Sequence, residues 1–252
     1  MGFLAKTKSS TEWKLITNVI STLVEEASFE ATVEGIQFRA MDPSHVAMVD
    51  LNWPNASFEK YECDKPFKLT LRIEELSKLI KRANQNNSIS ISAENDEYMA
   101  VNIENGYKKK FQIRLIESSY VPQQVPKLDL DSKIHMDKSI FDNTLIDVDA
   151  VADHITIETT QDQITFSGNG DSGKAAITLN KEDKGINELT SKKESKSTYS
   201  LQYLISILKA IGSSSETITA EYSEGMPFKM EFKLGESGGF INFYLAPRID
   251  NR

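Results

Sequence analysis

The stretch IEELSKLIKRA at residues 73–83 decides the fold, because its pattern returns as LQYLISILKAI at residues 201–211. Position 73 of the first stretch corresponds to position 201 of the second, a shift of 128 residues. The apolar residues correspond in pairs: Ile73 with Leu201, Leu76 with Leu204, and Leu79 with Ile207. Apolar residues at this spacing form one face of an amphipathic helix. The sequence therefore predicts the same helix twice.

Further similarities at the same shift extend the repeat toward both ends of the chain. Helical spacing in residues 11–25 has a counterpart in residues 141–153, where Phe141 takes the place of Trp13. An alternating strand pair follows each of these helices, and each half closes on an apolar strand. Similarities in the same order indicate a duplicated unit, with the order βαβββαβββ. We therefore expect an α+β protein made of two similar domains.

A connector separates the two halves, with the sequence SSYVPQQVPKLDLD. Pro122 and Pro126 disfavour a helix there and favour an extended chain. The expected boundaries are residues 1–117 for the first domain, 118–131 for the connector and 132–252 for the second domain. The polar run NKEDKGINELTSKKESKS at residues 180–197 predicts a long exposed loop in the second domain.

The stretch GNGDSGKA, residues 168–175, resembles a phosphate-binding Walker loop, but Ala175 stands where a Ser or Thr would bind magnesium. A Walker loop runs from a strand into a helix, whose N-terminus binds phosphate. Here an alternating, β-branched run, AAITLN, follows the loop instead. The glycines and Asp171 suit a turn, so we interpret the stretch as a hairpin connection. A nucleotide-hydrolysing enzyme that uses this loop is the competing hypothesis.

Other patterns typical of catalysis are weak in this sequence. His45, His135 and His154 are far apart and give no close-spaced metal pair. Asp149 and Asp153 stand four residues apart on an expected helix, where paired acids are usually solvated. We therefore expect no catalytic residue, no metal and no cofactor, and a protein that is not an enzyme.

Composition limits the class of protein further. The single cysteine, Cys63, cannot form an internal disulfide, which favours a reducing compartment. The sequence has no apolar run long enough for a membrane span. The formal net charge of −8 argues against nucleic-acid binding over most of the surface, but it allows a basic patch on one face.

Three motifs carry a resemblance to a known family: GIQFRAMDPSHVAMVDL at residues 35–51, ELSKLIKRA at residues 75–83, and YLAPRI at residues 244–249. Together with the duplicated order and the proline-containing connector, they resemble the proliferating cell nuclear antigen, or DNA sliding clamp, family of archaea and eukaryotes. The similarity extends over essentially the whole chain.

The resemblance implies a trimeric ring of the processivity fold, with helices lining the hole and sheets outside. Such a ring encircles duplex DNA after a clamp loader has placed it there. It then tethers DNA polymerase, flap nuclease and ligase during replication and repair, without catalysis of its own. A homotrimer is expected, and a heterotrimer containing one copy of this chain stays open. The expected location is cytoplasmic in an archaeon and nuclear in a eukaryote.

Basic residues are expected on the DNA-facing surface. A sliding ring must contact the phosphate backbone weakly, so a few lysines and arginines should line the hole of an otherwise acidic protein. Lys78, Lys81 and Arg82 share one helix face, and Lys108 to Lys110 are expected on a loop. The full set is Lys14, Lys78, Lys81, Arg82, Lys108, Lys109, Lys110 and Lys209.

The resemblance also implies a pocket for partner peptides that carry a glutamine and paired aromatic anchors. Methionines suit such a pocket, because their flexible side chains adapt to many ligands. For each apolar residue taken alone, packing in the core is the alternative. The expected residues are Met41, His45, Val46, Met48, Val125, Pro126, Pro227, Tyr244, Leu245, Ala246 and Pro247.

The expected helix at residues 141–153 departs from the basic pattern, because it carries four aspartates and neither Lys nor Arg. We expect it to serve the joint between subunits, where opposite charges favour head-to-tail docking. Whether it instead faces the hole stays open. The expected interface residues are Arg82, Lys108, Lys109, Phe111, Ile113, Asp142, Asp147, Ala175, Ile177 and Leu179.

Overall fold

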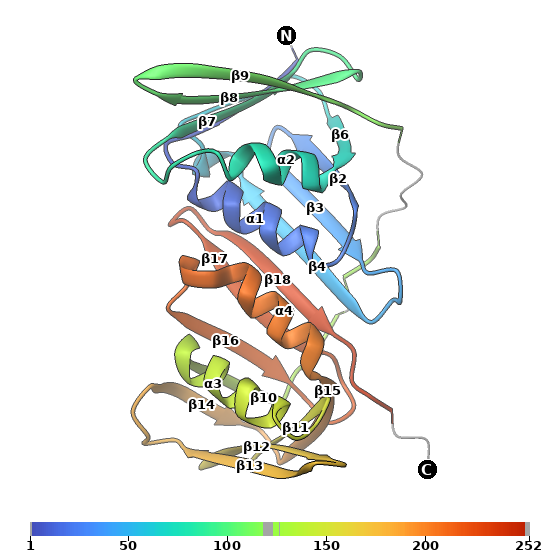
Figure 1. Cartoon of the computed structure of the whole chain (residues 1–252), viewed down its shortest axis with the longest axis vertical. Helices are drawn as coiled ribbons and strands as arrows, with labels where there is room; N and C mark the ends of the chain where they lie inside the picture. The colour runs from blue at the N-terminus through green and yellow to red at the C-terminus, as the bar shows by residue number, and fades with distance from the viewer. Residues whose placement is uncertain (1, 118–122, 126, 250–252) are drawn as a thin grey trace. The chain divides into compact units, whose positions relative to one another are not determined.

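The computed structural model describes residues 2–117, 123–125 and 127–249. Contacts divide the chain into two compact units. The first unit contains residues 1–125 together with 233–241, and the second contains residues 126–232 together with 242–252. Both units combine helices with antiparallel strands (Figure 1). Within the described residues, no helix is long and apolar enough to cross a membrane.

The two halves of the chain share one order of elements, a strand, a helix, five strands, a helix and three strands. The first half contains β1 (Phe3–Thr7), α1 (Thr11–Ser21), β2 (Glu26–Thr32), β3 (Gly35–Met41), β4 (Ala47–Pro54), β5 (Lys60–Cys63), β6 (Phe67–Arg72), α2 (Ile73–Ile80), β7 (Ser88–Ala93), β8 (Tyr98–Asn105) and β9 (Tyr107–Arg114). The second half contains β10 (Ser132–Asp137), α3 (Lys138–Asp149), β11 (His154–Thr159), β12 (Gln163–Gly170), β13 (Gly173–Asn180), β14 (Ile186–Ser191), β15 (Ser195–Ser200), α4 (Leu201–Ile211), β16 (Thr217–Tyr222), β17 (Phe228–Leu234) and β18 (Gly239–Leu245). The α+β class and the duplication agree with the sequence, but five strands rather than three separate the helices of each half.

In the first unit, α1 and α2 pack against each other over two antiparallel groups of strands (Figure 1). One group has the order β5-β1-β7-β8-β9, and the other contains β4-β3-β2-β6. Helix α1 begins at Thr11, whose amide donates a hydrogen bond to the Ser9 hydroxyl at 3.1 Å. In the core, the rings of Trp13 and Trp53 meet edge to face with centroids 4.8 Å apart. Such a pair stabilises the fold by about 0.5–1.5 kcal/mol beyond the burial of its area.

The second unit repeats this arrangement with α3 and α4 (Figure 1). One group of strands has the order β13-β12-β11-β15, and the other contains β14-β10-β16-β17. Phe141, the counterpart of Trp13, lies in the core with its ring centroid 5.7 Å from that of Phe166. Trp13 is 3% exposed and Phe141 is 1% exposed, so equivalent positions of the repeat anchor both cores.

Each unit has a strand of eight residues at the outer edge of a sheet. Strand β9 ends the first sheet, and β13 ends the sheet of the second unit. In the part of the chain that the structure describes, neither strand pairs along its outer edge. An open edge presents a row of backbone donors and acceptors that can pair with another chain.

The stretch at residues 168–175 forms a hairpin, as the sequence predicts. Strands β12 and β13 pair down to Gly170 opposite Gly173, and a tight turn joins them. A methyl group on Gly168 would lie 2.5 Å from the Val148 side chain of α3, and one on Gly170 would lie 2.2 Å from the Val151 carbonyl oxygen. These glycines therefore let the hairpin lie close to the end of α3. Since a strand follows the turn, the stretch lacks the helix N-terminus that a Walker loop needs.

The prediction of a long exposed loop at residues 180–197 is wrong. This run contains all of β14 and the first residues of β15. Strand β14 pairs with β10, which places Leu189 opposite Ile134, and both side chains are buried. The many lysines and glutamates of the run hide this pairing, because most of them lie in the turns before and after β14, and Glu188 and Lys196 are on the faces of their strands that are not buried.

Candidate functional site

Three of the basic residues that the sequence assigns to DNA, Lys78, Lys81 and Arg82, lie on helix α2 or directly after it. Ile73, Leu76 and Ile80 are buried and fix the orientation of the helix. The helix ends at Ile80, so Lys81 lies at its cap and Arg82 lies one residue beyond, where its amide donates to the Leu79 carbonyl at 3.0 Å. Both side chains are exposed.

The other helical lysines differ in exposure and in charge environment. The Lys78 amine lies 2.8 Å from the Glu74 carboxylate, one turn earlier on α2, and this lysine lowers the pKa of Glu74. Lys14 is half-buried on α1. Lys209 is exposed in the last turn of α4, where a cation interacts favourably with the helix dipole. Lys81, Arg82 and Lys209 are exposed as well, at or near the ends of α2 and α4.

Lys108, Lys109 and Lys110 lie on strand β9, so their placement on a loop is wrong. The turn before the strand uses Gly106, which has a positive φ of 70°. Successive strand residues point to opposite faces, so Lys109 is directed away from the other two. The Lys108 amine lies 3.2 Å from the Glu104 carboxylate, and the Lys109 amine lies 5.4 Å from the centroid of the Tyr107 ring.

The acidic helix begins earlier than its sequence pattern indicates. Helix α3 spans Lys138–Asp149, so it contains one lysine, and the Lys138 amine forms an ion pair with the Asp142 carboxylate. Asp147 and Asp149 are exposed. Ile146 is 61% exposed beside Asp147, and the sequence reasoning missed it. It could have been recognised in the sequence, because this apolar residue lies outside the helical spacing of the buried residues Phe141, Thr144, Leu145 and Val148.

The two open edges carry the apolar residues that the sequence assigns to the subunit joint. On β9, Phe111 is half-buried and Ile113 is buried. On β13, Ala175, Ile177 and Leu179 are all half-buried. Each edge therefore offers backbone hydrogen-bonding groups beside partly exposed apolar side chains.

The turn between β3 and β4 is built around Asp42, which the sequence reasoning missed. Its buried carboxylate accepts hydrogen bonds from the amides of Ser44, Val46 and Ala47 at 3.1, 2.7 and 2.6 Å. An aspartate in this role stabilises a turn. Its position just before Pro43 and Ser44 could have indicated this role in the sequence. His45 is exposed at the tip and has a φ of 58°, which is uncommon outside glycine.

The remaining residues assigned to the partner pocket fall into two groups by burial. Met48, Tyr244 and Leu245 are buried, and they pack within the protein. The residues with accessible side chains are Met41, His45, Val46 and Val125 in the first unit, and Pro227, Ala246 and Pro247 in the second. Pro126 lies outside the described residues.

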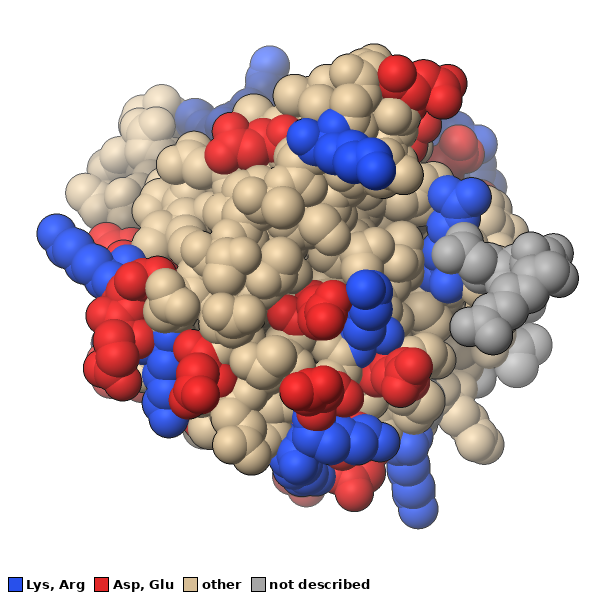
Figure 2. Space-filling view, turned by 90° about the horizontal axis from the view of Figure 1, so that it is seen from below, with Lys and Arg blue, Asp and Glu red and all other residues tan. Residues whose placement is uncertain are grey.

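Charge is mixed on the face of the protein shown in Figure 2. Acidic and basic side chains of the described residues lie next to one another, mainly in the lower part and at the rim of this view, and they do not form a single basic area. In the described chain, no group of three or more His, Cys, Asp or Glu side chains is arranged to hold a metal ion. The sequence assigns contact with DNA to the exposed cations near the ends of α2 and α4, among others.

A duplicated α+β unit with paired helices, layered strands and an eight-residue edge strand in each half defines the two-domain clamp class. Comparisons with known proteins agree. Residues 3–121 match the family model of the proliferating cell nuclear antigen N-terminal domain, and residues 124–248 match that of its C-terminal domain. The chain therefore belongs to the proliferating cell nuclear antigen family, the sliding clamps that act as non-catalytic processivity factors in DNA replication.

Individual relatives show how similar the chain is to known clamps. A DNA polymerase sliding clamp of Nitrosopumilus maritimus (strain SCM1) is 50% identical over 251 residues and covers 100% of both chains. One of Cenarchaeum symbiosum (strain A) is 48% identical with the same coverage. A crystal structure of the antigen from Thermococcus kodakaraensis has a TM-score of 0.92 over 98% of this chain and 100% of its own. At 24% identity, that structure supports the fold alone.

Proposed function

We propose that three copies of this chain form a closed ring that encircles duplex DNA and holds replication proteins on it. The observation that carries the proposal is the pair of eight-residue edge strands, β9 in the first half and β13 in the second. If β9 of one copy pairs with β13 of the next, each copy uses two different surfaces. Such head-to-tail contacts generate a ring when the rotation closes.

The joint between copies would combine strand pairing, apolar burial and charge. Phe111 on one edge and Ile177 and Leu179 on the other supply the partly exposed apolar surface. Arg82 and Lys108 would meet the acidic side of α3, where Asp147 is exposed and Ile146 adds apolar area. Asp142 contributes less, because Lys138 already neutralises it. Lys109 and Ile113 complete the proposed interface on β9.

Weak contacts with the phosphate backbone would let the ring slide. Lys81, Arg82 and Lys209 are exposed, and Lys81 and Lys209 occupy equivalent positions of the repeat. Contacts of this kind are sequence-independent and weaken as salt rises, because counterions compete for the phosphates. Lys14, Lys78 and Lys110 would add to the positive electrostatic potential around the DNA. The closed ring, rather than a high affinity, would keep the protein on the DNA.

The partners would dock through short peptides with a glutamine and paired aromatic anchors. We assign this site to the accessible residues Met41, His45, Val46 and Val125, with Pro126, Pro227, Ala246 and Pro247. DNA polymerase, flap nuclease, ligase and the clamp loader would then share one site. In an archaeal cell, where the relatives are found, the protein would work in the cytoplasm beside the chromosome.

We also propose that the chain has no catalytic activity of its own. The turn at residues 168–175 connects two strands and presents Lys174 to solvent, which gives a nucleotide no phosphate-binding helix. Two alternative functions predict different experimental results. A heterotrimer would require related chains for assembly, and an NTPase would hydrolyse ATP alone.

The solution mass of the purified chain tests assembly. Multi-angle light scattering should give three times the chain mass of 28.3 kDa at micromolar concentration. A mass of one or two chains at every concentration would reject the homotrimer. Recovery of a trimer on adding a related clamp chain from the same organism would then support the heterotrimer.

A further inference from the structure

The guanidinium group of Arg39 contacts both its own sheet and the connector. Arg39 on β3 lies directly opposite Asp50 on β4. Its Nε and Nη2 donate to the same carboxylate oxygen of Asp50, at 2.9 and 2.8 Å. Its Nη1 donates to the backbone carbonyl of Gln123 at 3.1 Å. One planar side chain thus joins a buried carboxylate to the start of the described connector, all within the first unit.

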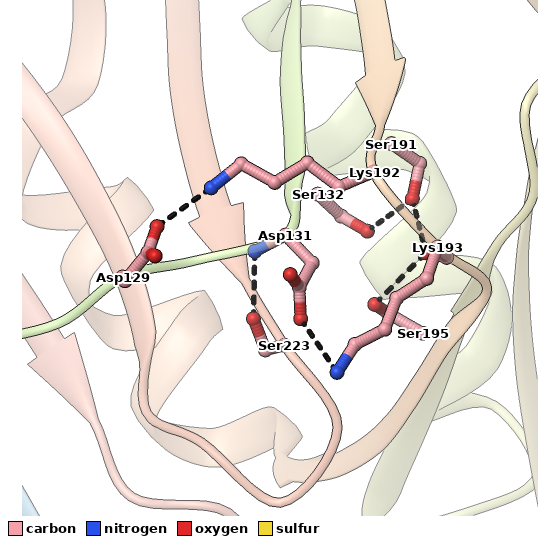
Figure 3. A network of polar contacts seen from close by, with 8 residues as sticks. All are labelled: Asp129, Asp131, Ser132, Ser191, Lys192, Lys193, Ser195 and Ser223. Atoms are coloured by element: carbon pink, nitrogen blue, oxygen red, sulfur yellow. Dashed lines mark hydrogen bonds and ion pairs between the residues drawn. The ribbon is translucent and has the colours of Figure 1, made fainter.

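A second set of ion pairs holds the other end of the connector, within the second unit (Figure 3). The Lys192 amine lies 2.6 Å from the Asp129 carboxylate, and the Lys193 amine lies 3.1 Å from that of Asp131. Both lysines belong to the turn between β14 and β15.

Backbone hydrogen bonds fix the same point. The Lys192 amide donates to the Asp131 carbonyl at 2.9 Å, and the Asp131 amide donates to the Ser223 hydroxyl at 2.7 Å. The hydrogen bond from Lys193 holds the pKa of the Asp131 carboxyl below its ordinary value. Asp129 raises the pKa of Lys192 in the same way. Both shifts favour the charged forms that make up the ion pairs.

We propose that Arg39, Lys192 and Lys193 are positioning residues for partner binding. Arg39 holds Gln123, two residues before Val125, on the first unit, and Lys192 and Lys193 hold Asp129 and Asp131 on the second, so each side of the connector is fixed on its own unit. This inference rests on the proposed partner site, because Val125 belongs to it. Fixing a segment before it binds lowers the entropy that binding must remove, and the peptide affinity rises accordingly.

The two anchors are unequal. The side chains of Arg39 and Asp50 are 35% and 11% exposed, whereas those of Lys192 and Asp129 are 61% and 92% exposed. Exposed pairs are screened by water and salt and contribute little. Arg39 should therefore dominate, and Lys192 and Lys193 should have a smaller effect that fades at high salt.

The substitution Arg39→Lys tests the stronger anchor. Lysine keeps a positive charge beside Asp50 but lacks the planar fork that reaches the carboxylate and the Gln123 carbonyl together. Arg72→Lys, at an exposed position before α2, is the matched control. A double variant, Arg39→Gln with Asp50→Asn, removes both charges and leaves no uncompensated buried carboxylate.

Two measurements apply to each variant. Calorimetry measures the affinity for a synthetic peptide with a glutamine and two aromatic residues. Hydrogen exchange measures the exchange rates of the backbone amides of residues 123–125. We expect both Arg39 variants to bind about tenfold more weakly, the size of one lost hydrogen bond from a charged group, and to exchange faster in the connector. The Arg72→Lys control should match the wild type in both.

Equal affinity in the wild type and in both Arg39 variants overturns the inference, whatever the exchange rates. Weaker binding with unchanged exchange also overturns it, because the loss would then not come through the connector. If the wild type itself binds no such peptide, the proposed partner site fails and the inference fails with it. These outcomes separate failure of the anchor from failure of the proposed function.

Discussion

Lys138 and Asp142 form an ion pair one turn apart on α3, with their side chains 12% and 32% exposed. The negative charge available to a neighbouring copy therefore lies at Asp147, further along the helix, and not at Asp142. We predict that Asp147→Asn weakens trimer assembly modestly, because exposed ion pairs contribute about 0.2–1 kcal/mol. Asp147→Lys should dissociate the ring at low protein concentration, since it repels Arg82.

The measurement is light scattering over a range of protein and salt concentrations. Arg82→Asp combined with Asp147→Lys should partly restore the trimer, which distinguishes pairing from general disruption. Asp142→Asn is the matched control and should have a smaller effect on assembly. A fully trimeric Asp147→Lys protein at every concentration would contradict the charge assignment.

Ile146 gives an independent prediction for the same joint. Its side chain is 61% exposed in the single chain, and burial against a neighbouring copy would stabilise the ring. Ile146→Ala should raise the dissociation constant of the trimer. The free energy of assembly should weaken by about 25 cal/mol for each Å² of buried apolar area lost. Val33→Ala, at a residue that is 60% exposed in another unit, should leave assembly unchanged. Equal assembly of both variants would place Ile146 outside the joint.

Gly168→Ala should destabilise the second unit. Its methyl group would lie 2.5 Å from the Val148 side chain and 2.9 Å from the Ala152 side chain, both on or next to α3. Overpacking of this kind costs about 1–3 kcal/mol. Chemical denaturation measures the loss. Lys174→Ala, on the exposed face of β13, is the control and should leave the stability unchanged. Neither this variant nor the wild type should hydrolyse ATP.

The DNA contacts give a charge-reversal prediction. Lys81→Glu with Lys209→Glu should reduce loading onto circular DNA at low salt, because both side chains are exposed at equivalent positions of the repeat. Lys233→Glu, at an exposed position on β17, is the control for net charge. All three proteins should remain folded and trimeric. Loading by the double variant at the wild-type level would place these lysines away from DNA.

The partner site predicts a common loss of affinity. Met41→Ala and Val46→Ala should weaken several unrelated partner peptides together, by about 2 kcal/mol where the residue is a central contact. Leu245→Ala should instead lower the stability of the fold by about 2–5 kcal/mol, because Leu245 is fully buried. Calorimetry and thermal unfolding separate the two effects. Unchanged affinity of all peptides for the first two variants would show that the site lies elsewhere.

The duplication could be read from the sequence because buried residues recur at equivalent positions. Trp13 and Phe141 are both core residues, and the hairpin at residues 168–175 follows from its glycines and from the alternating strand after it. These features depend on local pattern and turn chemistry, which a single sequence contains.

The features that the sequence did not predict depend on tertiary pairing. Strand β5 has four residues, and β14 lies within a polar run, so neither shows a clear alternation of its own. Both become strands because β1 and β10 offer them a partner. The contact of Arg39 with Gln123 was not predicted for the same reason, because it joins residues that are distant in sequence. Strand formation of this kind reflects context more than intrinsic propensity.

Topological retention on DNA tests the central claim most directly. The protein is loaded onto a nicked circular plasmid by its clamp loader and then washed at high salt, which removes contacts held by charge alone. The encircling ring predicts that the protein stays on the circle and is released when a restriction enzyme linearises the plasmid. Equal retention on circular and linear DNA, or loss from both at high salt, would contradict it.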